Sequence, residues 1–189
     1  MPDHSQPVGF GAVHSPIRFY IANRPPLDDY PSLDRLQSLV PGEIAHIVQH
    51  TSNHWRKVFN VLAKVLFDWY GQQGHDDLPE SWQAYRDQVL LQSHSQEALL
   101  FSAPDFSQSE PVHIVLGKTY AAALELPPLN WLDSHFAVNQ AHRLVVSPYP
   151  DYRQLSNERI GRLIELIAAG WPLLQPPSFC GSGHPAATL

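Results

Sequence analysis

Apolar residues recur along this chain in short unbroken runs and in longer stripes spaced by three and four residues. The short runs, rich in branched and aromatic side chains, predict buried strands at residues 17–22, 98–103, 112–116 and 143–147. The spacing and capping residues predict helices at residues 32–40, from Pro41 and Glu43, from Ser52 or Asn53 to Gly71, at 79–92, at 118–126 and from Ser156. Because parallel strands need crossover connections, strands that alternate with helices favour a mostly parallel sheet covered on both faces.

The two ends of the chain lack this periodicity. Residues 1–16 contain proline, glycine and histidine without a repeat, which predicts a loosely held arm. Residues 172–189 are punctuated by proline and glycine and predict a tail. We therefore expect a single α/β domain over residues 17–171, with three layers and a small four-stranded sheet.

Composition excludes several classes of protein. Among 189 residues, the formal charge of −6 argues against a protein that coats nucleic acid nonspecifically, because phosphate binding depends on lysine and arginine. The only cysteine, Cys180, excludes an internal disulfide, a four-cysteine zinc site and a cysteine-held iron–sulfur cluster within one chain. With no secretory signal and no long apolar stretch, we expect a cytoplasmic protein without membrane contact or cofactor.

Three histidines raise the question of a metal. His46, His50 and His54 are four residues apart and would share one face of a continuous helix, where their imidazoles could hold a metal ion. The intervening residues 51–53 are a threonine, a serine and an asparagine, which favour helix caps. We therefore predict a helix break and no bound metal.

Two loops are the expected places for a ligand, because open α/β sheets bind ligands beyond the carboxyl ends of their strands. These loops are residues 23–30 and 148–155. In the first, Asp28 and Asp29 follow a proline pair and are typical of turn or helix caps, although a carboxylate there could also activate a water. In the second, Tyr149 and Tyr152 have no periodic partner, which leaves surface packing and ligand stacking equally open.

Four segments combine a strand or helix with asparagine, glycine or proline at its end. They are IRFYIANRPP (17–26), TSNHWRKVFNVL (51–62), VHIVLGKTYAAAL (112–124) and RLVVSPYPDYRQLS (143–156). Together they resemble the uracil-DNA glycosylase superfamily, and its mismatch-specific branch most of all, over roughly residues 17–167. The resemblance implies that family's fold, a role in DNA repair, and DNA or a free nucleobase as the partner.

The resemblance also implies site residues. Asn23 would position a water, and Tyr149 stands where the family has a histidine or asparagine that contacts the base. The remaining implied binding residues are Arg24, Pro25, Asn53, Pro148, Asp151, Tyr152 and Arg153.

The chain departs from the family motifs at two places. Arg24 intervenes between Asn23 and Pro25, and Asp151 stands where the family has a serine. Asp151 puts a negative charge where the family approaches a phosphate, so it should weaken DNA binding unless Arg153 pairs with it.

Two functions remain open at this point. The first is recognition of a nucleobase or nucleic acid, with cleavage of the N-glycosidic bond by a water that Asn23 orients. The second is a catalytically silent member of the same fold that acts as a binding or interaction module. Both predict that Asn23 and Tyr149 face one another across one pocket at the carboxyl ends of the sheet.

Overall fold

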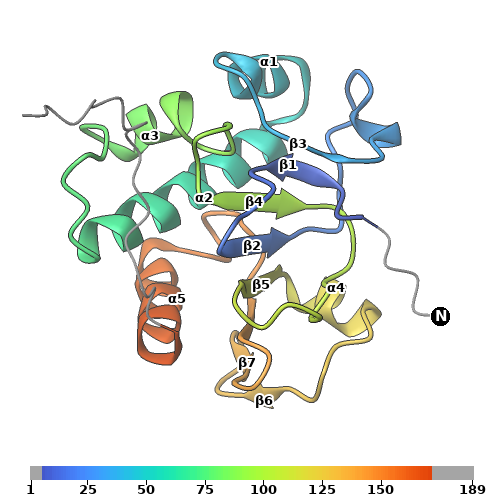
Figure 1. The fold of residues 1–189 in the computed structure, drawn as a ribbon, viewed down its shortest axis with the longest axis vertical. Helices are drawn as coiled ribbons and strands as arrows, with labels where there is room; N and C mark the ends of the chain where they lie inside the picture. The colour runs from blue at the N-terminus through green and yellow to red at the C-terminus, as the bar shows by residue number, and fades with distance from the viewer. Residues whose placement is uncertain (1–5, 172–189) are drawn as a thin grey trace, which may run out of the picture.

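The structure is a computed structural model that describes residues 6–171. Its centre is an eight-stranded mixed sheet with the strand order β3-β1-β4-β2-β5-β8-β7-β6 (Figure 1). The strands are β1 (Gly9–Gly11), β2 (Ile17–Tyr20), β3 (Leu36–Gln37), β4 (Glu97–Leu100), β5 (Val112–Leu116), β6 (Asn130–Trp131), β7 (Ala137–Asn139) and β8 (Leu144–Ser147). The protein is therefore an α/β protein.

The four central strands, β4, β2, β5 and β8, are parallel neighbours. The prediction that the strands starting at residues 17, 112 and 143 lie side by side and parallel is confirmed. The expectation of a small four-stranded sheet is wrong, because short strands extend the parallel centre on both sides. The strands β1 and β7 meet the centre in the antiparallel sense. These added strands have two or three residues each, too few to produce a recognisable alternation of apolar and polar positions.

Helices cover both faces of the sheet, but unequally. The helices are α1 (Glu43–His50), α2 (Asn53–Gln72), α3 (Trp82–Gln88), α4 (Lys118–Ala123) and α5 (Asn157–Gly170). The buried side chains of α1, α2, α3 and α5 pack in one cluster with Phe19, Ile114 and Val145 of the sheet. Ala121 of α4 packs in a second cluster with Tyr20 and Val115, on the opposite face (Figure 1). The period-two alternation of strand side chains produces this division.

The helix α2 confirms the most regular stripe in the sequence. It begins after Ser52 and buries Trp55 and Trp69 in the larger cluster, as their spacing predicts. The predicted break between the helices is also confirmed, since α1 ends at His50 and Thr51 adopts an extended conformation. Within residues 6–171, no helix combines the length and apolarity needed to cross a membrane.

Several predicted boundaries are wrong. Instead of a helix over residues 32–40, the chain forms a 3₁₀ turn (Tyr30–Ser32) and then β3. The predicted helices at 79–92 and 118–126 shorten to α3 and α4. Of the predicted loose arm, Gly9–Gly11 is instead the buried strand β1. Residues 1–5 and the predicted tail at 172–189 lie outside the described residues.

The glycines of β1 explain how this strand joins the sheet. Gly9 and Gly11 have φ angles of 157° and 126°. A Cβ at either position would overlap a backbone carbonyl oxygen of β4. The close approach therefore requires glycine, and the same glycines that suggest a loose arm in the sequence allow a strand in the fold.

Candidate functional site

The loops after β2 and β8 meet beyond the carboxyl ends of the sheet. Asn23 lies three residues after β2 and Tyr149 two residues after β8. The Asn23 Nδ2 donates a hydrogen bond to Tyr149 Oη at 3.2 Å. The prediction that these two residues meet is confirmed. The two side chains are in direct contact, and a ligand pocket bordered by both of them stays a prediction.

A third side chain, His54, completes this site. It lies in the first turn of α2, and its Nε2 is 2.5 Å from Tyr149 Oη. The two rings are stacked, with centroids 5.4 Å apart and planes 18° from parallel. We call Asn23, His54 and Tyr149 the Tyr149 cluster.

The sequence interpretation assigned Asn53 to the site and missed His54. Asn53 is the first residue of α2, and its side chain is exposed. His54 precedes the buried Val58 and Val61 by four and seven residues. That spacing places His54 on the inward side of α2, and it was the signal that could have found this residue.

The hydrogen bonds of the Tyr149 cluster determine where its protons lie. Burial lowers the pKa of His54, and Lys57 lowers it further while Asp151 raises it. Burial raises the pKa of Tyr149, against the effect of the hydrogen bond from Asn23. Both groups are therefore neutral at pH 7. Since the amide nitrogen of Asn23 can only donate, the phenol proton is assigned to the bond with His54 Nε2, which accepts it.

A charged pair lies beside the Tyr149 cluster. Lys57 Nζ is 3.2 Å from Asp151 Oδ2, and both side chains are about one-fifth exposed, at 22% and 21%. The backbone N–H of Arg153 donates to Asp151 Oδ1 at 2.8 Å and, with Lys57, lowers the pKa of Asp151. Arg153 was the residue named in the sequence as able to pair with Asp151, but the cationic side chain in contact with this carboxylate is Lys57.

Gly117 forms the wall of the cluster on the α4 side. It separates β5 from α4 with a φ of 104°, and a Cβ there would lie 3.4 Å from the Tyr149 ring. The positive φ of this turn favours glycine, and the Tyr149 ring packs against it.

Other predicted binding residues lie in the two loops and make contacts within the protein. Arg24 NH1 donates to the carbonyl oxygens of Tyr30, Pro31 and Leu33, so it holds residues 24–33 together. Pro25 and Pro148 are buried. The exposed Tyr152 lies against Lys57, whose Nζ is 4.7 Å from the ring centroid.

The acidic and histidine motifs of the sequence also have structural partners. Asp28 pairs with His46 at 2.8 Å, and His50 Nδ1 contacts the His46 carbonyl. Asp29 precedes the 3₁₀ turn and accepts a hydrogen bond from Ser32 through its carbonyl oxygen. Within residues 6–171, no group of three or more histidine, cysteine or acidic side chains could hold a metal ion. The absence of bound metal in the purified protein stays a prediction.

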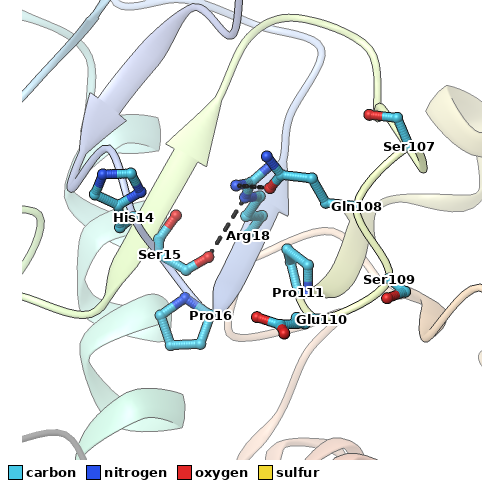
Figure 2. Close-up of a pocket in the computed structure, with 9 residues that line it drawn as sticks. All are labelled: His14, Ser15, Pro16, Arg18, Ser107, Gln108, Ser109, Glu110 and Pro111. Carbon is cyan, nitrogen blue, oxygen red and sulfur yellow. Dashed lines mark hydrogen bonds between the residues drawn. The ribbon is translucent and has the colours of Figure 1, made fainter.

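A cavity lies at the opposite edge of the sheet. It has a volume of about 550 Å³ and lies at the amino ends of β2 and β5. Figure 2 shows Arg18 between Ser15 and Gln108, to which its guanidinium donates, with Glu110 and Pro111 on the facing loop. None of the predicted site residues lines this cavity.

The fold and the cluster define an α/β protein with a polar site at the carboxyl edge of a mixed sheet. The chain belongs to a family described as a family of unknown function, DUF6942, whose model matches residues 8–168. The match covers every strand and helix of the structure except the last two residues of α5. No curated protein and no solved structure matches the chain.

Proposed function

We propose that this protein recognises a nucleobase, free or within a nucleic acid, at the Tyr149 cluster and hydrolyses the N-glycosidic bond of the bound nucleoside unit. The observation that supports the proposal is the convergence of three neutral hydrogen-bonding side chains from α2 and from the loops after β2 and β8. Three of the four motifs that resemble uracil-DNA glycosylases contribute these residues, and the four central strands are parallel as that resemblance expects.

The cluster has the groups that this reaction needs. Asn23 uses its Nδ2 on Tyr149, and its exposed side chain leaves Oδ1 able to accept a hydrogen bond from a water. The phenol O–H of Tyr149 can turn from His54 to a carbonyl oxygen of the base. There it would stabilise the charge that develops as the base departs.

The chemical step balances without a cofactor. The water oxygen forms a bond to C1′, the bond from C1′ to the base nitrogen breaks, and the electron pair of that bond leaves with the base. The proton of the water passes to the departing base. Asn23 orients the water and does not act as a base, while His54 holds the phenol in place in the resting state.

A second function is favoured by a specific observation. The polar groups of the site already satisfy one another, since Asn23 and His54 both bond to Tyr149 and Lys57 is paired with Asp151. Such a closed network suits a catalytically silent binding module, in which a ligand contacts the outer edge of the cluster without a reaction.

A panel of oligonucleotides separates these two functions. Single- and double-stranded DNA carrying uracil, mismatches or deaminated purines is incubated with the protein and scored for abasic sites, while binding is measured by fluorescence anisotropy. For an active enzyme, Asn23→Ala should lose most base release, and Tyr149→Phe should lose less because only one hydrogen bond disappears. His94→Ala, which changes an exposed histidine ahead of β4, is the control.

The outcomes are distinct. Base release that depends on Asn23 supports the glycosylase. Binding without base release, weakened by His54→Ala and Tyr149→Phe, supports the silent module. If the cluster variants behave like His94→Ala in both base release and binding, both functions are refuted.

A further inference from the structure

Two exposed aromatic side chains lie on either side of the Tyr149 cluster, each with a lysine against its ring. Lys57 Nζ is 4.7 Å from the ring centroid of Tyr152, and Lys118 Nζ is 4.7 Å from that of Trp131. Tyr152 is 51% exposed and Trp131 39% exposed, and both are among the few large apolar side chains of residues 6–171 that reach the surface. We define the four residues as the flanking aromatic–lysine pairs.

The two pairs occupy opposite sides of the sheet. Lys57 belongs to α2, which packs on the face of Phe19, whereas Lys118 begins α4, which packs on the face of Tyr20. Both pairs lie at the carboxyl edge of the sheet. Tyr152 shares the loop of Tyr149, and Lys118 follows Gly117, which lies against the Tyr149 ring.

The strand register gives the position of Trp131. Trp131 pairs with Ala137, and Ala137 pairs with Val146, close to the carboxyl end of β8. Two strand spacings of about 4.8 Å separate Trp131 from Val146, so the backbone of Trp131 lies about 10 Å across the sheet from the strand that leads into Tyr149.

The Trp131 pair borders a cavity with mostly apolar walls. The cavity measures about 400 Å³, and its walls combine Ala121, Ala122 and Leu129 with Trp131, Lys118 and Asp133. The backbone N–H groups of His135 and Phe136 bond to Asp133 Oδ1 and lower the pKa of Asp133, which keeps its carboxylate charged. A charged carboxylate repels a phosphate but accepts hydrogen bonds from the N–H groups of a base.

We propose that the carboxyl edge of the sheet binds single-stranded nucleic acid, with one base stacked on Tyr152, one base in the cavity beside Trp131, and the phosphates between them near Lys57 and Lys118. This inference rests on the proposed function, since it extends the site of one nucleobase to its neighbours. Stacking on aromatic rings tolerates any base and is combined with cationic contacts in single-strand binding proteins. Lys118 makes no ion pair with the described residues, so it is able to meet a phosphate.

The same geometry favours single-stranded nucleic acid over a duplex. A duplex keeps its bases stacked on one another, so it cannot place separate bases on rings at opposite sides of the sheet. The net charge of −6 opposes binding of any polyanion, so we expect modest affinity that depends on stacking and is best measured at low salt.

The test measures anisotropy of labelled 15-nucleotide oligo(dT), oligo(rU) and a duplex, each with the full-length protein. Trp131→Ala and Tyr152→Ala should each weaken binding of single strands at least fivefold. Lys118→Gln should reduce the slope of log K against log salt by about 0.7. Two matched controls should leave binding unchanged. Lys64→Gln alters a third aromatic–lysine pair, in which Lys64 Nζ lies 5.0 Å from the ring centroid of Trp82. Val40→Ala trims another exposed apolar side chain.

The results for the two proposals can be told apart. Equal binding of duplex and single strand, or no binding at all, overturns the inference. A second result also overturns the inference: Trp131→Ala and Tyr152→Ala behave like the controls, while His54→Ala and Tyr149→Phe alter binding or base release. In that case the proposed function stands. If the flanking variants weaken binding while the cluster variants change neither binding nor base release, the inference stands and the proposed function fails. Circular dichroism of each variant confirms that its fold is intact.

Discussion

Glu97 is a buried carboxyl group at the first residue of β4, on the sheet face that α2 and α3 cover. Its Oε1 accepts hydrogen bonds from Tyr85 Oη and the Leu91 N–H, and its Oε2 accepts them from Tyr70 Oη and the Gln96 N–H. Burial raises its pKa from 4.5 to about 7, although the four donors act in the opposite direction. The carboxyl therefore changes charge inside the core near neutral pH.

The effect on stability has a definite sign. Because the folded pKa of Glu97 is the higher one, the folded state holds this proton more tightly than the unfolded chain between pH 4.5 and about 7. Its contribution is fully present below pH 4.5 and is lost as pH rises through about 7. A difference of about 2.5 pKa units at 1.36 kcal/mol each corresponds to about 3 kcal/mol.

A second buried group, His113, has the opposite effect on how stability depends on pH. His113 in β5 contacts Tyr20 Oη through Nδ1 at 2.6 Å, and burial lowers its pKa from 6.5 to about 4. With a lowered folded pKa, its contribution is present above pH 6.5 and is lost as pH falls through about 4. The two windows overlap, so the wild-type protein should show little net change in stability from these groups between pH 5 and 6.5.

The substitution Glu97→Gln separates the contribution of Glu97 to stability from that of His113. The free energy of unfolding is measured by urea denaturation, followed by tryptophan fluorescence, at half-unit steps from pH 4.5 to 8. The wild-type value minus the variant value should fall by about 3 kcal/mol over this range, and the variant alone should become more stable as pH rises. The contribution of His113 is common to both proteins and cancels in the difference.

The opposite variant provides the control. His113→Gln keeps Glu97, so its stability should fall as pH rises from 4.5 to 7. A wild-type minus Glu97→Gln difference that stays constant within about 1 kcal/mol would refute the reasoning, because it would show that burial does not raise the pKa of this carboxyl.

Three further predictions concern the site and its surroundings. Gly117→Ala forces a Cβ into a backbone with φ of 104° and should lower the free energy of unfolding by about 1–3 kcal/mol, whereas Gly161→Ala, inside α5 with open space around it, should raise it by about 1 kcal/mol. NMR titration should find the pKa of His54 below 6.5, lower still in Asp151→Asn and higher in Lys57→Met, and unchanged values in both variants would contradict the assigned electrostatics. Elemental analysis of the purified protein should find no stoichiometric zinc or iron, and metal at one equivalent would show the histidine interpretation wrong.

Strong periodicity explains the parts of the fold that could be predicted. The central strands and α2 bury continuous apolar runs or a regular stripe, and such patterns leave one arrangement that hides them from water. The helix predicted over residues 32–40 was wrong. The leucines of this segment repeat at helical spacing, but β3 forms through its pairing with β1 and not from a pattern of its own. A two-residue strand exists only through its partner, so local sequence cannot reveal it.

The candidate site could likewise be predicted only in part. The sequence places Asn23 and Tyr149 at strand ends, and parallel strands bring those ends to one edge, so their meeting could be predicted. It could not show that the phenol reaches Asn23 directly, since that depends on side-chain length and on the close approach of Gly117. The partner of Asp151 could not be predicted either, because Lys57 is 94 residues away in the chain.

The sequence by itself determined the α/β class, the parallel centre of the sheet and the edge at which polar loops gather, because apolar periodicity and crossover connections are local properties of the chain. Only the tertiary structure decided the eight-stranded extent of the sheet and the contact of His54 with Tyr149. It also decided the burial of Glu97 beneath Tyr70 and Tyr85. Each of these depends on distances between segments far apart in the chain, and such distances are set by packing of the whole core.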